Sequence, residues 1–346
     1  ELDYVLYWLK PVCFTVPGLS IGDPNDPEPG VFGQPGTRLI QGDHKFEFRG
    51  ANGLRSRLGF WLTKDQFLGV ETEGFVLEQV TASQDVVAGA ANPPVFLVFQ
   101  NPDGTNAALP FSIPGVVNGS STAVGQSQMW GLETNLAIHF HQQRGPWTLH
   151  ATGLFGCRYL HLEDRVIVTN RQSLVSEPSI TAVGEAQFAT RNQFVGGQLG
   201  SRLGVERGPW QVDLTTKLAF GETHLVSMVA GGPLLSGASV APPLVPGPLL
   251  ALPSNVGQSS SNRITVVPEL NLRVRWRFLD GCYVTVGYNL LYWNKILCPG
   301  DQMDRQVNIT ALPFRGPLVG RPAPAPKFVF TDTFRQGLEA GLGINF

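Results

Sequence analysis

The chain has 346 residues and a formal net charge of −2, and 15% of its residues are charged. That fraction is well below the roughly 25% of ordinary soluble proteins, and the near-neutral balance gives no reason to expect nucleic acid as a partner. No apolar run provides the roughly 20 uninterrupted residues of a membrane-spanning helix. Prolines break the best candidate, residues 225–253. We therefore expect residues 1–346 to form a single β-domain.

Alternating apolar and polar residues predict strands along the chain. The first alternation, LDYVLYWLK, begins at once, so we expect a mature chain from which a signal peptide has been removed. Further alternation gives about ten strands, near residues 2–10, 46–62, 67–80, 126–142, 147–166, 188–206, 210–226, 262–278, 283–297 and 330–346.

A repeated RGPW motif marks two of the tight turns between these strands. It begins at Arg144 and again at Arg207, and each copy follows one alternating segment and opens another. Both copies therefore predict strand, tight turn, strand, with a tryptophan just after the turn.

The connections between strands are of two kinds, and this decides the fold class. Tight turns alternate with long segments that we interpret as irregular, about 11–45, 80–126, 170–186, 228–262 and 298–328. Soluble domains rarely carry several unstructured loops of this length, whereas outer-membrane barrels combine short periplasmic turns with long extracellular loops. The sequence therefore predicts an all-β, antiparallel, up-and-down transmembrane β-barrel in the bacterial outer membrane.

Aromatic residues gather at the predicted turn side. Trp147, Trp210, Trp276 and Phe278 lie next to short turns, where barrels carry an interfacial girdle. The alternating segment GLEAGLGINF ends on Phe346, at the same level. A terminal aromatic residue after such a strand resembles the assembly signal of outer-membrane proteins, which implies the barrel assembly machinery as a partner of the C-terminal strand.

Several segments together resemble the BBP-type outer-membrane β-barrel family of planctomycetes. They are YVLYWLKP at the start, GVFGQPGTRLI (30–40), LRSRLGFWL, LFGCRYLHLEDRVIV (154–168), VGYNLLYWNKILCPGDQMDRQVN (286–308) and QGLEAGLGINF at the end. Their order covers nearly the whole chain. The resemblance implies an outer-membrane barrel and brings no catalytic residues with it.

Charged residues share the predicted inner face of the strands. They are Arg55, Arg57, Glu71, Glu73, Glu133, Arg202, Lys217, Glu269, Arg273, Arg275, Arg277 and Glu339, with Arg158 and Asp213 beside them. A barrel of about eight strands is filled by its own side chains, while aqueous channels need about 16. We therefore expect a narrow lumen of paired charges; the alternative is a basic strip that selects an anion.

Histidines and cysteines give weaker indications. His139, His141 and His150 are expected to be hydrogen-bonded lumen residues, since no third ligand group accompanies them. No metal or other cofactor is predicted. Cys13 and Cys298 follow the outer ends of the first and ninth strands, so we predict a disulfide between them. Cys157 and Cys282 are expected to stay unpaired.

Two of the predicted outer loops carry apolar segments that suggest contacts with partner subunits. Residues 229–253 contain no charge, and the loop after the second strand carries PPVFLVF (93–99) and LPFSIPGVV (109–117). Exposed apolar patches usually mark interaction sites. We therefore expect, besides lipid, a homo-oligomer or a larger outer-membrane assembly; the alternative is that these segments fold back over the barrel mouth.

Three functions remain open at this point. The first is a structural or assembly barrel without enzymatic activity, the second a narrow pore for small solutes, and the third an enzyme with an extracellular site. The predicted loops offer only His44 and scattered aspartates for the third.

Overall fold

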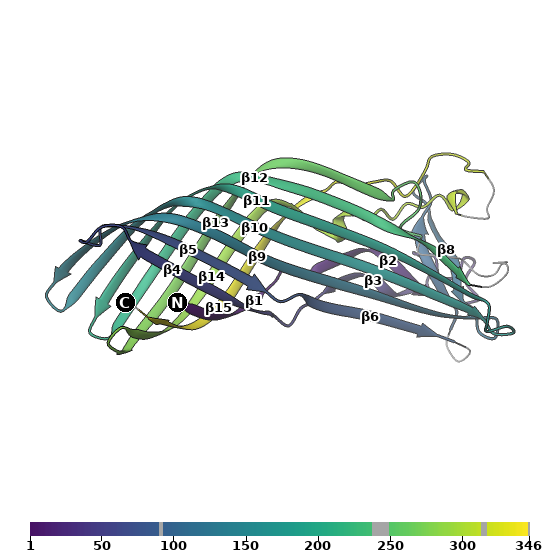
Figure 1. Cartoon of the computed structure of the whole chain (residues 1–346). Helices are drawn as coiled ribbons and strands as arrows, with labels where there is room; N and C mark the ends of the chain where they lie inside the picture. Colours follow the sequence, from purple (N-terminus) through teal and green to yellow (C-terminus); the bar gives the residue numbers. More distant parts are fainter. Residues whose placement is uncertain (90–92, 237–248, 313–316, 345–346) are drawn as a thin grey trace.

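The computed structural model describes residues 1–89, 93–236, 249–312 and 317–344, and its main element is a closed ring of ten antiparallel strands (Figure 1). The ring strands are β1 (Leu2–Trp8), β4 (Ala51–Trp61), β5 (Leu68–Leu77), β9 (Val117–Arg144), β10 (Trp147–Leu174), β11 (Thr181–Arg207), β12 (Trp210–Ser236), β13 (Gly257–Leu279), β14 (Cys282–Leu297) and β15 (Phe330–Ile344). The all-β barrel of ten strands that the alternation predicts is confirmed.

The first and last ring strands close the barrel. β1 pairs antiparallel with β15, with Leu2 opposite Leu342 and Trp8 opposite Gln336, and on its other side with β4. Closure gives each ring strand a neighbour on both sides, as a sheet in lipid requires. Short turns gather at one end of the barrel, here called the turn end, and the long connections lie at the other, the loop end (Figure 1).

The RGPW motif forms the turns that the sequence predicts. Gly145 joins β9 to β10 and Gly208 joins β11 to β12, with φ of 61° and 60°. Two-residue hairpin turns need positive φ, which glycine adopts without strain.

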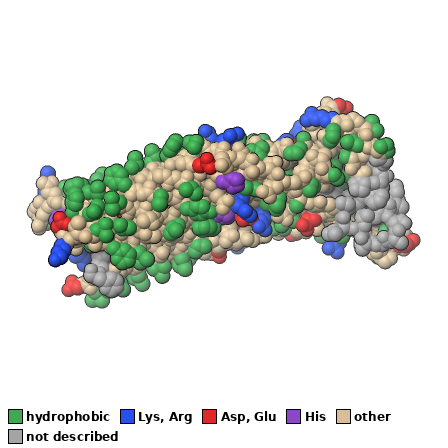
Figure 2. All heavy atoms as spheres, turned by 45° about the horizontal axis from the view of Figure 1, so that its top comes forward, with side chains coloured by type: hydrophobic (Ala, Val, Ile, Leu, Met, Phe, Trp, Pro, Cys, Tyr) green, Lys and Arg blue, Asp and Glu red, His purple; other side chains and the backbone are tan. Residues whose placement is uncertain are grey.

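Alternation separates an apolar outer surface from a polar interior. Leu199, Leu203, Leu214, Leu218 and Phe220 are examples of large apolar side chains that point outward and are exposed. Figure 2 shows such side chains covering the turn-end half of the barrel as a continuous band. A surface of this kind suits lipid and not water. Among the described residues, no helix is long and apolar enough to span a membrane.

The predicted irregular loops are instead largely ordered, which corrects that part of the prediction. β9–β12 are 27 or 28 residues long and continue far beyond the apolar band. A further strand, β6 (Val80–Ala88), pairs with β9 in this extension. A second sheet has the order β3-β2-β7-β8, built from β2 (Val12–Ile21), β3 (Arg38–Phe46), β7 (Val95–Gln100) and β8 (Asn106–Ser112).

The second sheet packs inside the extension. Phe14 and Phe46 join a core with Val166 and Phe188 of the long strands. Leu19, Leu97, Phe99 and Phe111 form a second core with Val307 and Leu312. The extension is therefore a packed β-domain on the barrel's own strands.

The Pro-Gly-Asp-Gln sequence forms the 3-10 turn η1 (Pro299–Gln302), which fixes β2 against the barrel. A Cβ at Gly300 would lie 2.0 Å from the carbonyl oxygen of Cys13, so only glycine permits this approach. Gln302 donates to the carbonyl oxygen of Val329 at 2.8 Å and accepts from its N–H at 3.0 Å. A second 3-10 turn, η2 (Ile309–Ala311), follows.

The apolar segments proposed as partner surfaces are partly buried within the chain. PPVFLVF forms β7, with Val95, Leu97 and Phe99 in the core. Leu249, Leu250, Ala251 and Leu252 are also buried, because they fold back over the second sheet. Two apolar loops can be buried at once because the second sheet supplies a much larger apolar surface than a barrel mouth. Residues 237–248 lie outside the described residues.

Candidate functional site

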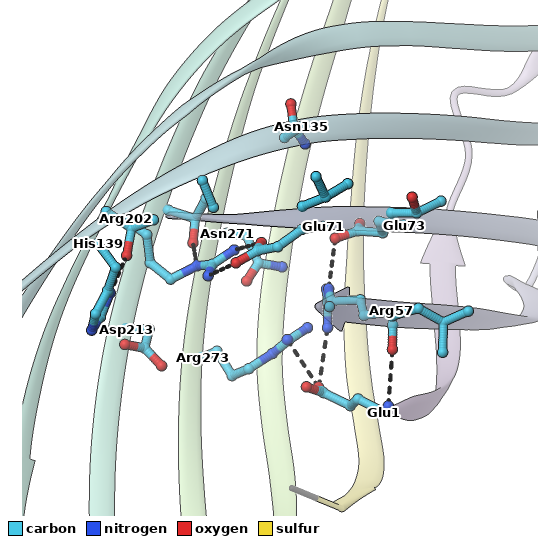
Figure 3. Close-up of a pocket in the computed structure, with 18 of the residues that line it drawn as sticks. Glu1, Arg57, Glu71, Glu73, Asn135, His139, Arg202, Asp213, Asn271 and Arg273 are labelled. Carbon is cyan, nitrogen blue, oxygen red and sulfur yellow. Dashed lines mark hydrogen bonds and ion pairs between the residues drawn. The ribbon is translucent and has the colours of Figure 1, made fainter. Parts of the chain in front are cut away.

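A cavity of about 710 Å³ enters the barrel from the turn end. Its walls carry polar and charged side chains from all sides of the ring, including Arg57, Glu71, His139, Arg202 and Asp213. Figure 3 shows these side chains pointing inward from different strands. They project into the cavity because each occupies an inward position of its strand's two-residue period.

One group of ion pairs at the inner end of the cavity is organised by Glu339 on β15. Its carboxylate lies 3.1 Å from Arg55 and 2.5 Å from Arg273, on β4 and β13. Arg57 bonds Glu73 at 2.6 Å and Asp3 at 2.8 Å. This group therefore links strands on both sides of the β1–β15 closure.

A second group lies beside the first and is organised by Glu133 on β9. Arg158 of β10 bonds both Glu133 and Glu269, and Lys217 of β12 bonds Glu133. Lys217 also lies 3.6 Å from Glu73, which joins the two groups. The result is one charge layer across the barrel.

The charges in this layer are matched. Its basic members are Arg55, Arg57, Arg158, Lys217, Arg273 and Arg275, and its acidic members are Glu1, Asp3, Glu73, Glu133, Glu269 and Glu339. Burying an unpaired ion costs several kcal/mol, and pairing offsets that cost only when the remaining polar atoms are also satisfied. The layer matches its charges in number, but among the described residues Arg55 Nε, Arg158 Nη1 and Arg275 Nε are buried without a hydrogen-bond partner.

An apolar layer follows directly on the loop side of the charge layer. It is formed by Tyr7, Leu9, Leu77, Met129, Leu160, Leu162, Phe194, Val267, Leu291 and Trp293 with smaller neighbours, all buried. The inward side chains change from charged to apolar at the same level on two facing strands. The change lies between Glu133 and Met129 on β9, and between Glu269 and Val267 on β13. Trp293 of β14 reaches over the inner face of β13 and donates to Thr223 Oγ1 of β12 at 3.1 Å. The charge layer and the apolar layer therefore follow each other along the lumen.

The other predicted lumen residues lie nearer the cavity mouth. Glu71 accepts two bonds from Arg202, at 2.9 and 2.7 Å. Arg275 also bonds Gln211 at 3.3 Å, and its guanidinium lies over the ring of Tyr283. Arg277 pairs with Glu206 at the exposed rim and is not part of the charge layer.

The three histidines stack along one wall of the cavity mouth. His139 lies between His141 and His150, at ring-centroid distances of 6.1 and 5.5 Å. His139 bonds Thr152 at 2.9 Å and His150 bonds Glu206 at 3.1 Å. In the part of the chain that the structure describes, no group of three or more His, Cys, Asp or Glu could hold a metal ion.

Sequence reasoning missed two members of the charge layer, Glu1 and Asp3, and also Tyr7, which bonds this layer from the apolar layer. Glu1 and Asp3 bond Arg57 and Arg273, and the Tyr7 hydroxyl accepts from Arg55 at 2.5 Å and donates to Asn289 at 2.6 Å. Asp3 and Tyr7 share the inner face of β1 with Val5, so the two-residue period would have found both.

The predicted aromatic girdle faces outward at the turn end. Trp210 stacks on Trp276 at 6.0 Å between ring centroids, and Phe278 packs beside Trp276 at 6.1 Å. The Trp147 ring lies under the Arg207 guanidinium. All four aromatic residues are exposed, while Phe346 lies outside the described residues.

The predicted disulfide between Cys13 and Cys298 is not formed, since Cys13, Cys157, Cys282 and Cys298 are all free thiols. The Cys13 Sγ instead donates to the carbonyl oxygen of Pro11, at 3.8 Å. Burial raises the pKa of the Cys298 thiol to about 12.

A closed ring with a lipid-facing apolar band, an aromatic girdle and a polar interior defines an integral β-barrel of the bacterial outer membrane. The chain belongs to the family described as "Putative beta barrel porin-7 (BBP7)", which matches residues 2–346. The resemblance to BBP-type barrels is thereby confirmed. The turn end consequently faces the periplasm and the extension faces the cell exterior. No curated protein matches the sequence.

Solved structures with some similarity are also outer-membrane proteins. They include the outer-membrane protease OmpT of Escherichia coli, with 9% identity, a TM-score of 0.35 and coverage of 100% of this chain and 97% of that one. The P. putida toluene transporter TodX has 7% identity, a TM-score of 0.21 and coverage of 99% and 89%. A loop-deletion variant of the Vibrio cholerae protein OmpT has 6% identity, a TM-score of 0.15 and coverage of 99% of both chains. Such low scores carry no information about activity.

Proposed function

We propose that this porin-like barrel is a structural, non-enzymatic protein of the outer membrane that does not conduct solutes. The proposal rests on two layers inside the barrel, one of paired charges and one of buried apolar side chains. An ion crossing the barrel would have to displace paired charges and then enter an apolar layer, where its desolvation is not compensated.

The extension supports a role in holding a domain outside the cell. β9–β12 run without interruption from the periplasmic turns into the extracellular part, and the second sheet packs on them. A domain mounted on continuous strands keeps a fixed height and orientation above the membrane, which suits a structural or assembly protein.

Planar-bilayer recording tests the proposal. Protein whose folding is verified by heat-modifiable gel mobility, and whose insertion is verified by flotation with liposomes, should show no stable channels. Steady conductance of porin size would contradict a closed lumen.

A narrow solute pore is the second candidate, favoured by the family description and by the cavity that enters the barrel from the turn end. In that case the charge layer would act as a gate. Brief, low-conductance openings that become longer in Lys217→Ala would support this candidate over the first.

We also propose that partner subunits contact the uncharged segment 237–248. Its sequence, GASVAPPLVPGP, is rich in apolar residues and proline and contains no charged residue. Apolar segments at a protein surface usually mark interaction sites. Deleting residues 237–248 should leave heat-modifiable folding intact and reduce the size of the native assembly. An unchanged assembly size would contradict the contact, whether the assembly is a homo-oligomer or a larger complex.

A further inference from the structure

The barrel wall has a seam between β13 and β14. Their ladder runs from Leu279 opposite Cys282 to Glu269 opposite Leu291 and ends there. Farther toward the loop end, β13 pairs with β12 and β14 pairs with β15. Pro268 lies at the first unpaired position, where its missing N–H removes a donor.

Side chains bridge the seam where the ladder is absent. The Asn294 side chain accepts from the N–H of Val266 at 2.8 Å. On the inner side, buried Trp293 reaches from β14 to Thr223 on β12. The seam is therefore closed toward the lumen and open only toward the outer surface.

The seam begins at the extracellular boundary of the apolar band. On neighbouring β12 the outward residue changes from Phe220 to Glu222 and then His224, all exposed. Figure 2 shows charged and histidine side chains where the apolar band ends. Unpaired strand edges are tolerated at this level, because lipid headgroups and water can satisfy them and hydrocarbon cannot.

Three exposed basic residues from three separate segments contact Phe330, Thr331 and Asp332 at the start of β15. Lys10 donates to the Asp332 carbonyl oxygen at 2.5 Å and to Thr331 Oγ1 at 3.2 Å. The Arg263 guanidinium lies over the Phe330 ring, 5.2 Å from its centroid. Lys295 sits at a bulge with φ of 53°, and its N–H donates to Asp332 Oδ1 at 3.0 Å.

The cluster combines the three basic groups with the carboxylate of Asp332, whose charge acts on Lys10 and Lys295. Among the described residues, none of Lys10, Arg263 and Lys295 has a carboxylate oxygen within 4.0 Å of its charged group. Both carboxylate oxygens of Asp332 on β15 are already bonded, one to the Lys295 N–H and the other to the Tyr292 hydroxyl at 2.6 Å. Guanidinium and ammonium groups that form no ion pair can donate hydrogen bonds to a phosphate group.

We propose that Lys10, Arg263 and Lys295 bind the phosphate group of an anionic lipid in the outer leaflet, with the headgroup resting on the seam. The level of the cluster and its charge favour a lipid over a soluble anion. Exposed Phe330 and Phe334 continue from it into the apolar band and offer a surface for the acyl chains. The seam matters because Arg263 lies on its β13 side and Lys295 on its β14 side.

Native mass spectrometry with lipid A, a phosphorylated glycolipid, tests the site. The variant Lys10→Gln/Arg263→Gln/Lys295→Gln removes the cluster. The control Lys64→Gln/Arg144→Gln/Arg207→Gln removes equal charge from exposed positions at the turn end. A basic residue near an anionic surface contributes about 1 kcal/mol, or about fivefold in affinity. We therefore expect the first variant to bind lipid A about 100-fold more weakly, while the control binds like the wild type.

Two further arms identify the chemistry that is recognised. Phosphatidylcholine, whose headgroup has no net charge, should bind weakly and equally to all three proteins, and millimolar inorganic phosphate should not displace lipid A. Equal lipid A binding by the two variants would overturn the site, and so would displacement by free phosphate. If the triple variant fails the heat-modifiability test, Arg263→Gln alone should still weaken binding about fivefold, and unchanged binding would overturn the site.

Discussion

Arg55 on β4 and Glu339 on β15 lie 3.1 Å apart inside the barrel, although 284 residues separate them in the chain. The two strands do not pair with each other, because β1 runs between them. Their side chains meet over the inner face of β1, next to Asp3 and Tyr7, so this contact forms only when the barrel has closed. The ion pairs of the charge layer that join β4 to β15 therefore form only together with the closure of the ring.

Replacing Glu339 should destabilise the barrel strongly. Glu339→Gln leaves Arg55 and Arg273 without their common carboxylate, and removing one partner of a buried ion pair typically costs about 3–5 kcal/mol. The temperature at which the heat-modifiable band shifts should fall clearly. The matched control is Arg277→Gln, which breaks the exposed rim pair with Glu206 and should cost no more than about 1 kcal/mol. Equal effects of the two substitutions would show that the buried ion pairs of the charge layer stabilise the barrel no more than an exposed ion pair does.

The apolar layer predicts a graded effect at one position. Trp293 is fully buried, packs against Phe194 at 6.2 Å between ring centroids and donates to Thr223. Trp293→Phe keeps most of the packing and loses the hydrogen bond, which costs about 1 kcal/mol. Trp293→Ala also leaves a cavity and should cost about 3–5 kcal/mol. Urea unfolding from detergent, followed by far-UV circular dichroism, measures both, and a reversed order would contradict the packing role.

Local patterns account for most of what the sequence predicts correctly. The ten ring strands follow from a period of two, since one face of each strand meets lipid and the other the lumen. The turns follow from glycine at positive φ, at Gly145 and Gly208. The inward positions of Glu71, Glu133 and Lys217 follow from the same period.

The second sheet could not be predicted in this way because its strands lack that period. In β7, three successive residues, Leu97, Val98 and Phe99, are all buried. A strand covered on both faces has no polar side to alternate with. Which carboxylate pairs with which guanidinium depends on strand order and register, and no local pattern encodes these.

The four thiols should differ in reactivity. Cys298 is buried, and burial raises the pKa of its thiol to about 12, so that very little of the reactive thiolate is present at pH 8. Cys282 opens β14 at a tight turn and is partly exposed. A polar maleimide at pH 8 should therefore label Cys282 in the folded protein and Cys298 only after unfolding. Peptide mapping by mass spectrometry reports both, and equal labelling rates would contradict the burial of Cys298.

Residues 249–252, which pack against the second sheet, should be needed for the stability of the extracellular domain. Leu250 packs with Phe14, Phe188 and Met303, whereas nearby Val256 is exposed. Leu250→Asp would bury a carboxylate without a partner, which costs several kcal/mol, while Val256→Asp places the same charge in water. The barrel should remain folded in both variants, because its two lumen layers do not contain Leu250.

Protease added to intact cells should therefore cleave the extracellular part of Leu250→Asp much faster than that of Val256→Asp, with the heat-modifiable barrel unchanged. The faster cleavage follows because an uncompensated buried charge raises the population of the opened domain, and proteases cut the opened form. Equal cleavage rates would mean that residues 249–252 only cover the second sheet and do not stabilise it.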